Sequence, residues 1–272
     1  MIIYENTRGG FINDIRSGGI AVKVENAFEL HGIHHNNDAE FRAWANSLLY
    51  MRNVLDDDAI PEDISLAIEY QIPLTSKRVD FLLAGKDENG ADNVVVVELK
   101  QWEDSGITSR PDVVTAFTGG SNRAVCHPSY QAFSYAKIIE NFNEVVDRNN
   151  IRMRPCAYLH NYREENRAHI YNDLYREAVS VAPVFLQEDV AKLREFIKTY
   201  IKKKDGIDLL MKIDHGKLKP AKALQDSLCY IIDPNLELRK QGINNVWNSF
   251  DLNPITKFHR ELKLNLVDEN GT

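Results

Sequence analysis

Eight residues decide the fold of this chain: Asn93–Lys100, which read NVVVVELK. Four successive valines favour a strand that is buried on both faces, because a half-exposed strand alternates apolar and polar residues. Helices should therefore cover both sides of the sheet that contains this strand. The strand ends in two charges, Glu98 and Lys100, which its two-residue period places on one face. Burying charges there is costly unless they are paired or hold a metal ion.

Two further strands are predicted just upstream, over residues 67–72 and 79–84, and the second contains one acid, Asp80. The segment Lys86–Gly90 follows and ends in Asn-Gly, which favours the positive backbone φ of a tight turn. A hairpin closed by this turn would bring Asp80 next to Glu98.

These neighbours suggest a chemistry. Two carboxylates, Asp80 and Glu98, and the backbone carbonyl of Leu99 would form a hard oxygen site suited to Mg²⁺. Lys100 could then orient or deprotonate a water molecule, or stabilise negative charge on a phosphate. Phosphodiester hydrolysis requires such a set, because the metal stabilises charge and acidifies the attacking water. The alternative is an ordinary ion pair of Glu98 with Lys100 or Arg78.

The rest of the chain reads as a mixed α/β domain over residues 1–204, followed by a small helical appendage or linker over 205–272. Residues 101–123 read as a long loop. Apolar periodicity and strand composition predict the remaining elements as helices over 40–55, 128–146 and 188–201, with Asp38 capping the first, and strands over 155–160 and 179–186.

Composition narrows the class of protein. The 272 residues carry a net charge of −7, which argues against a general nucleic-acid coat. No apolar run approaches the ~20 residues of a membrane span, and the first residues carry no signal-peptide pattern. The three cysteines have no CxxC spacing, which favours a reducing, cytoplasmic setting.

The helix predicted over 128–146 carries Gln131 and Tyr135 one turn apart on one face. The order Asp80, Glu98-Leu99-Lys100 and Gln131–Tyr135 resembles the PD-(D/E)xK nuclease superfamily, in its RecB-like branch. The resemblance implies a restriction-endonuclease-like mixed sheet flanked by helices. It also implies Mg²⁺, with Mn²⁺ able to substitute, held by the two acids, and a catalytic role for Lys100. Gln131 and Tyr135 would position the lysine or the scissile phosphate.

The superfamily often has a further acid, placed before the hairpin. By order along the chain, Glu40 in the first predicted helix is one candidate. Glu69 in the strand over 67–72 is the other. An outward-facing charge is the alternative for each residue.

Several separated blocks also resemble the N-terminal region of uncharacterised bacterial Schlafen-like DNA/RNA helicases. That resemblance implies a nuclease acting on DNA, or less readily on RNA, in bacterial antiviral defence or repair. The phosphate loop of the helicase motor does not occur in these residues, so ATP hydrolysis is not expected. Either the sequence is a fragment of a longer helicase with a missing motor domain, or the nuclease module stands alone or works with a helicase partner. A homodimer would suit cutting both strands of a duplex. The matching blocks are residues 1–5, 44–51, 68–73, 75–81, 98–103, 127–135, 155–162 and 217–228.

Residues 192–222 hold ten basic and four acidic residues, a local excess that suits phosphate contact or, equally, a solvated helix face. Other basic and aromatic side chains near the motifs could contact nucleic acid. Alternatively, the aromatic ones pack in the core and the basic ones are simply exposed to solvent. The candidate nucleic-acid-binding residues are Arg78, Trp102, Arg123, His127, Lys202, Lys203 and Lys204.

Two other functions stay open. A non-catalytic module that binds nucleic acid or docks a helicase system would show salt-sensitive DNA binding without a metal requirement. A protein-interaction subunit would show no DNA binding even at low salt.

Overall fold

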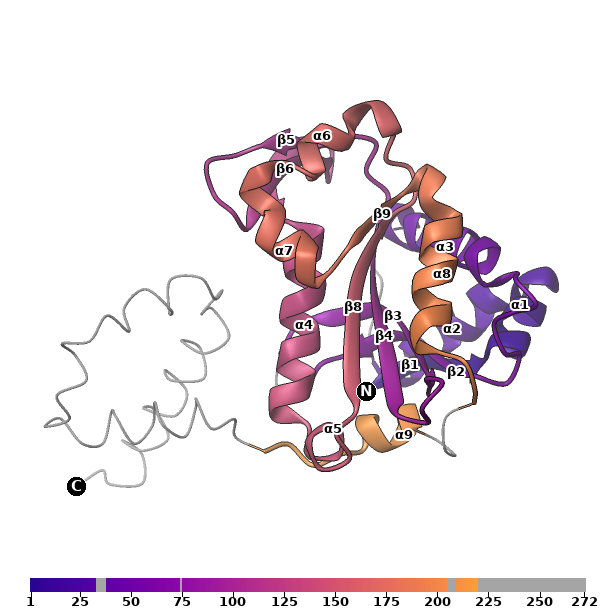
Figure 1. The fold of residues 1–272 in the computed structure, drawn as a ribbon. Coiled ribbons are helices and arrows are strands. Elements are labelled where there is room, and N and C mark those ends of the chain that lie inside the picture. Colours follow the sequence, from indigo (N-terminus) through magenta and orange to yellow (C-terminus); the bar gives the residue numbers. More distant parts are fainter. Residues whose placement is uncertain (33–37, 74, 205–208, 220–272) are drawn as a thin grey trace, which may run out of the picture. The chain divides into compact units, whose positions relative to one another are not determined.

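The computed structural model describes residues 1–32, 38–73, 75–204 and 209–219, without the side chains of 38–44. Its main sheet has six strands in the order β1-β2-β3-β4-β8-β9. The first four are antiparallel, whereas β4, β8 and β9 run parallel (Figure 1). The strands are β1 (Ile2–Thr7), β2 (Ser65–Gln71), β3 (Arg78–Lys86), β4 (Asp92–Lys100), β8 (Arg152–Leu159) and β9 (Val184–Leu186).

Helices cover both faces of this sheet, as the run of valines predicted. Val95 and Val97 pack into one core cluster with α1, α2, α3 and α8, while Val94 and Val96 pack into another with α4, α5 and α9. Figure 1 shows α4 and α8 on opposite sides of β4 and β8. These helices are α1 (Arg8–Arg16), α2 (Ile20–Leu30), α3 (Asp38–Leu55), α4 (Pro128–Phe142), α5 (Glu144–Arg148), α8 (Val190–Tyr200) and α9 (Leu209–Asp214).

The turn between β3 and β4 is the predicted one. Asp87 and Ala91 close it through a backbone hydrogen bond of 3.0 Å, and Gly90 takes a φ of 81°. Its register pairs Phe81 with Val97, which fixes the neighbours at the far end of both strands.

The predicted loop over 101–123 is wrong. It holds a second, three-stranded sheet, β5-β6-β7, which lies beyond the N-terminal end of α4 in Figure 1. Gly119 and Gly120 both take positive φ and form the two-residue turn between β6 and β7. The strands are β5 (Gly106–Ile107), β6 (Val113–Thr118) and β7 (Ser121–Cys126), with α6 (Arg167–Ile170) and α7 (Arg176–Val181) nearby in the fold.

Two predicted elements divide. The helix over 128–146 breaks at Asn143, whose extended backbone lets its side chain accept hydrogen bonds from Val145 and Val146 and cap α5. The strand over 179–186 shrinks to β9, because residues 176–181 form α7.

The first compact unit extends to Lys219, beyond the boundary expected at 204. The physical reason is apolar burial, since Leu209, Leu210 and Ile213 of α9 pack into the core on the α4 side. The remainder of the predicted appendage, 220–272, lies outside the described residues. No helix in the described ranges is long and apolar enough to cross a membrane.

Candidate active site at the ends of β3 and β4

The hairpin register brings the two predicted acids together. Phe81 pairs with Val97, so the next row of the same hairpin places Asp80 beside Glu98. Asp80 Oδ2 accepts a hydrogen bond of 2.7 Å from the backbone N–H of Leu99. Glu98 is 1% exposed and Asp80 is partly buried. These two side chains are called the carboxylate pair below.

Lys100 completes the cluster. Its Nζ lies 2.6 Å from Glu98 Oε1, on the same face of β4. The backbone carbonyl of Lys100 accepts a hydrogen bond of 3.1 Å from the N–H of His160, which ties this end of β4 to the segment after β8. The predicted ion pair of Glu98 with Lys100 is therefore present, and it lies beside a second carboxylate.

Burial makes both acids hard to ionise. It is the main cause that raises the pKa of Asp80, against the opposing charge of Lys100. Burial and then the charge of Asp80 raise the pKa of Glu98 to about 8. Burial alone would lower the pKa of Lys100, but the carboxylate pair outweighs it and raises that pKa.

One oxygen of Glu98 has no partner. Oε2 is buried and meets no hydrogen-bond partner in the part of the chain that the structure describes. Asp80 acts on Glu98 through its charge and, when one of the two acids is protonated, through a side-chain hydrogen bond. Oε2 therefore lacks a partner among the described residues while both acids are ionised. Two adjacent buried carboxylates repel each other, so one of them keeps a proton unless a cation neutralises the pair. Their oxygens fit Mg²⁺, which binds one or two carboxylates and keeps several waters.

A pH-dependent stability follows for the metal-free protein. The folded state keeps the Glu98 proton up to a pH of about 8, whereas the unfolded chain loses it near the ordinary pKa of 4.5. Folded stability should therefore fall between these pH values, by the order of a few kcal/mol. The melting temperature in EDTA should fall less from pH 5 to pH 9 in Glu98→Gln than in wild type. Parallel curves for the two proteins would contradict the assignment.

Helix α4 brings Gln131 and Tyr135 to the same face of the sheet. Gln131 Nε2 donates a hydrogen bond of 3.1 Å to the Tyr135 hydroxyl, as their one-turn spacing predicted. Burial and then the charge of Glu98 raise the pKa of Tyr135, so this phenol stays protonated. Because its oxygen accepts from Gln131, its own proton remains available for another acceptor.

Of the two candidates for a third acid, the structure describes the side chain of Glu69 alone. Glu69 takes an unusual φ of 56° and pairs with Arg78 at 3.2 Å. Its neighbours Ile68 and Tyr70 face opposite sides of the sheet, so β2 is irregular at this point. Glu40 lies in α3, where its side chain is not described. The described residues contain no group of three or more His, Cys, Asp or Glu placed to hold a metal.

The residues predicted to contact nucleic acid do not lie together on one surface. Trp102 lies near the site, with its ring centre 5.6 Å from Lys100 Nζ. His127 is fully buried, and its ring nitrogens engage the carbonyl of Ile170 and the N–H of Ser129. Burial lowers the pKa of His127 to about 4, so this ring is neutral and caps α4, and it offers no exposed contact to a phosphate.

The exposed lysines 202–204 lie at the opposite end of the strands, since Lys203 pairs with Lys86 beside the β3–β4 turn. That position is six residues of β4 from Glu98, or about 20 Å. Arg123 lies in β7, where it bonds Ser121 and Gly119. The predicted basic patch is therefore not part of the candidate site.

Two neighbours of the site were not among the predicted site residues. Cys126 feels the charges of Glu98, Lys100 and Lys77, and burial is the main cause that raises its pKa to about 12. Cys126 is therefore a neutral thiol. Lys77 has no carboxylate partner among the described residues, and it adds a positive charge to this end of the sheet. Its place directly before Arg78-Val79-Asp80 was the only clue in the sequence.

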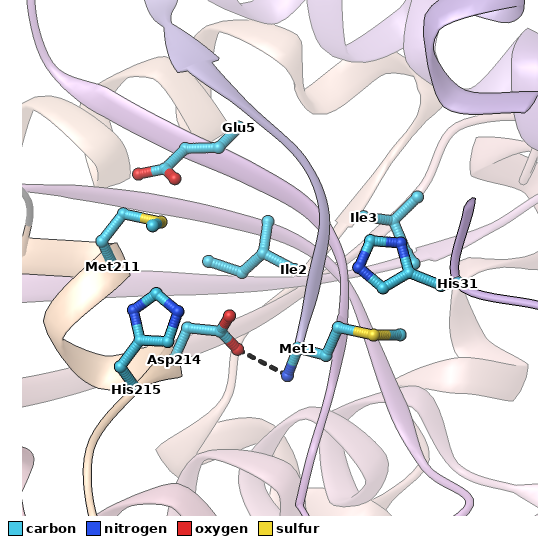
Figure 2. Close-up of a pocket in the computed structure, with 8 residues that line it drawn as sticks. All are labelled: Met1, Ile2, Ile3, Glu5, His31, Met211, Asp214 and His215. Atoms are coloured by element: carbon cyan, nitrogen blue, oxygen red, sulfur yellow. Dashed lines mark ion pairs between the residues drawn. The ribbon is translucent and has the colours of Figure 1, made fainter. Parts of the chain in front are cut away.

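A hollow of about 530 Å³ lies elsewhere, at the edge formed by β1 and α9 (Figure 2). His31, Asp214 and His215 line it, and Asp214 forms an ion pair with the amino group of Met1. None of the residues around Asp80 and Glu98 lines this hollow. It is therefore separate from the candidate active site.

Fold and site together define a class: a mixed α/β protein with a buried acid–acid–lysine cluster at the end of a hairpin in its central sheet. Comparison with protein-family models, with curated proteins and with solved structures finds no match for this chain.

Proposed function

We propose that this chain is a metal-dependent nuclease of the PD-(D/E)xK superfamily, with a restriction-endonuclease-like fold, that hydrolyses phosphodiester bonds of DNA. The observation that carries the proposal is Glu98 Oε2, a buried oxygen beside a second carboxylate that meets no hydrogen-bond partner among the described residues while both acids are ionised. A purely structural ion pair of Glu98 with Lys100 would need no second buried acid.

The arrangement of elements supports the same proposal. Asp80 lies on β3, Glu98 and Lys100 lie on the adjacent β4, and α4 covers the same face with Gln131 and Tyr135. The order of these residues along the chain is that of the superfamily motif. RNA as substrate and a place in antiviral defence rest on the resemblance alone.

The carboxylate pair would hold the ion, Mg²⁺ or Mn²⁺. When bound, the ion would stabilise charge on the phosphate and lower the pKa of a water ligand. Lys100, held by Glu98, would place its ammonium against the phosphate or a water. The protonated Tyr135 would donate a hydrogen bond to a phosphate oxygen, with Gln131 holding the phenol in place. A carbonyl contribution from Leu99 remains part of the proposal.

The test is incubation of the purified chain with supercoiled plasmid and circular single-stranded DNA, in Mg²⁺, in Mn²⁺ and in EDTA. We expect cutting that both metals support and EDTA stops. Absence of cutting on DNA and on an RNA substrate, at any metal concentration and with a folded protein, would overturn the proposal.

The exposed lysines 202–204 favour a second candidate function, a docking module for nucleic acid or for a helicase system. They lie far from the carboxylate pair, so binding there would need no metal. A partner that carries a helicase motor, or a second copy of the chain, would suit such a module. Replacing all three lysines with Gln should weaken metal-independent DNA binding if this function holds.

A further inference from the structure

One end of the small sheet β5-β6-β7 lies next to the candidate site. Cys126, the last residue of β7, feels the charges of Glu98 and Lys100. The next residue, His127, caps α4, and its N–H donates to the carbonyl of Asp112 at 2.8 Å. Along the chain, the sheet therefore lies between the strand that carries Lys100 and the helix that carries Gln131.

One face of this sheet leads away from the site. Val113 pairs with Cys126 at the base of the hairpin, and Phe117 pairs with Asn122 near its tip. Side chains alternate along a strand, so Phe117 and Asn122 lie on the same face as Cys126. The other face is buried, with Val114 in a core cluster. Four residues separate Cys126 from Asn122, which corresponds to about 14 Å.

Phe117 lies at the far end of this face, near the hairpin tip, and most of its side chain is exposed. It is 67% exposed, and it is the one aromatic among the exposed large apolar side chains of the described residues. It makes no ring contact with any described residue. Aromatic rings on open sheet faces suit unpaired bases, because every base offers a flat surface for stacking.

The charges nearby favour a polyanion. Lys77 lies close to Cys126. Arg123 pairs with Ala116 near the hairpin tip, so its exposed side chain leaves the sheet on the face opposite Phe117. Neither forms an ion pair with an acid among the described residues, whereas most of the other described lysines and arginines do. Arg123 is held by Ser121 Oγ at 3.0 Å and by the carbonyl of Gly119. A phosphate backbone running from the tip to the carboxylate pair would meet Lys77 at its inner end, and Arg123 would reach it only around the tip of the hairpin.

We propose that this sheet binds single-stranded nucleic acid, with Phe117 stacking on a base and the phosphates leading toward Glu98 and Lys100. The inference rests on the proposed nuclease function and narrows it to a substrate with unpaired bases. A paired base within a duplex cannot offer its face to Phe117, so an intact duplex should gain nothing from this ring.

The test measures binding of labelled single-stranded DNA, single-stranded RNA and a DNA duplex by fluorescence anisotropy. The protein carries Asp80→Asn so that it cannot cut. Phe117→Ala should weaken single-strand binding about ten-fold, and leave duplex binding unchanged. Phe117→Trp should bind single strands as tightly as the parent protein does, because its ring can also stack on a base. The slope of affinity against salt should stay the same in Phe117→Ala, because the ring contacts no phosphate. Whichever of the single-stranded DNA and RNA arms depends on Phe117 identifies the substrate.

Ile107→Ala is the matched control. Ile107 lies in the same sheet, is 47% exposed and pairs with Val114 on the opposite face. It should bind as the parent protein does. Equal effects of Phe117→Ala and Ile107→Ala, or an equal loss for the duplex, would overturn the inference.

The experiments distinguish failure of the nuclease proposal from failure of the proposed binding surface. Binding that depends on Phe117, in a wild-type chain that cuts nothing, would support the binding surface and refute the nuclease. Metal-dependent cutting that Phe117→Ala leaves unchanged on single strands, with unchanged binding, would support the nuclease and refute the surface.

Discussion

Replacing Asp80 with Asn is expected to lower metal-dependent cleavage by roughly 10³-fold, the equivalent of several kcal/mol of charge stabilisation. The fold should survive, because the Asn amide oxygen can still accept the hydrogen bond from the N–H of Leu99. Folded stability at pH 8 should equal or exceed that of wild type, because burial opposes ionisation of this carboxyl. The measurements are initial cleavage rates in Mg²⁺ and thermal melts of both proteins.

Metal binding can be followed without activity. An ion that binds the folded state raises the melting temperature, so Mn²⁺ should raise that of wild type and not that of Asp80→Asn. Asp92→Asn is the matched control, since Asp92 forms an ion pair with Lys86 at the other end of β4. It should keep both activity and the metal shift. Cleavage by Asp80→Asn at the wild-type rate would refute the role of the carboxylate pair.

Replacing Lys100 with Met is expected to lower the cleavage rate by roughly 10²- to 10⁴-fold, the range typical of a positioned acid–base group. Met keeps the apolar length of the side chain and removes the ammonium beside Glu98. The variant should still bind metal, because the carboxylate pair is intact. The rate should therefore fall while the shift of melting temperature with Mn²⁺ remains.

Removal of one partner from a buried ion pair also affects stability. Glu98 would lose its only cation partner in the described part of the chain, so some destabilisation is expected. Lys86→Met removes the equivalent cation from the pair with Asp92, about 20 Å away along β4. A cleavage loss in Lys100→Met that Lys86→Met matches would show that the effect is structural rather than catalytic.

Much of the site could be predicted from local sequence. The alternation of a strand places Glu98 and Lys100 on one face, and the Asn-Gly turn fixes which residue of β3 meets β4. Helical spacing likewise places Gln131 and Tyr135 one turn apart. These signals depend only on neighbours within a hairpin or a turn, so they survive without knowledge of the rest of the fold.

The small sheet shows where a local signal was present and was missed. Residues 113–118 are rich in β-branched and aromatic types, and Gly119-Gly120 follows them as a hairpin turn. The pattern is short and its strands belong to no continuous apolar run. The candidate binding surface at Phe117 therefore emerged only from the structure.

The placement of charges had no local signal. Lys202–Lys204 read as a basic patch, but the bridge of Lys203 to Lys86 puts them at the far end of the strands from Glu98. Glu69 read as a possible ligand, but nothing in the sequence indicated its positive φ or its ion pair with Arg78. Charge composition gives the number of charges and not their positions.

The sequence by itself determined that a strand buried on both faces ends in Glu98 and Lys100, with Asp80 on the adjacent strand. Periodicity and turn chemistry are properties of adjacent residues, which is why they could be read directly. Only the tertiary structure decided that the carboxylate pair is buried with an unpartnered oxygen, that α4 covers it, and that Cys126 and Lys77 lie beside it. Those features depend on desolvation and on contacts between segments far apart in the chain, which no local pattern encodes.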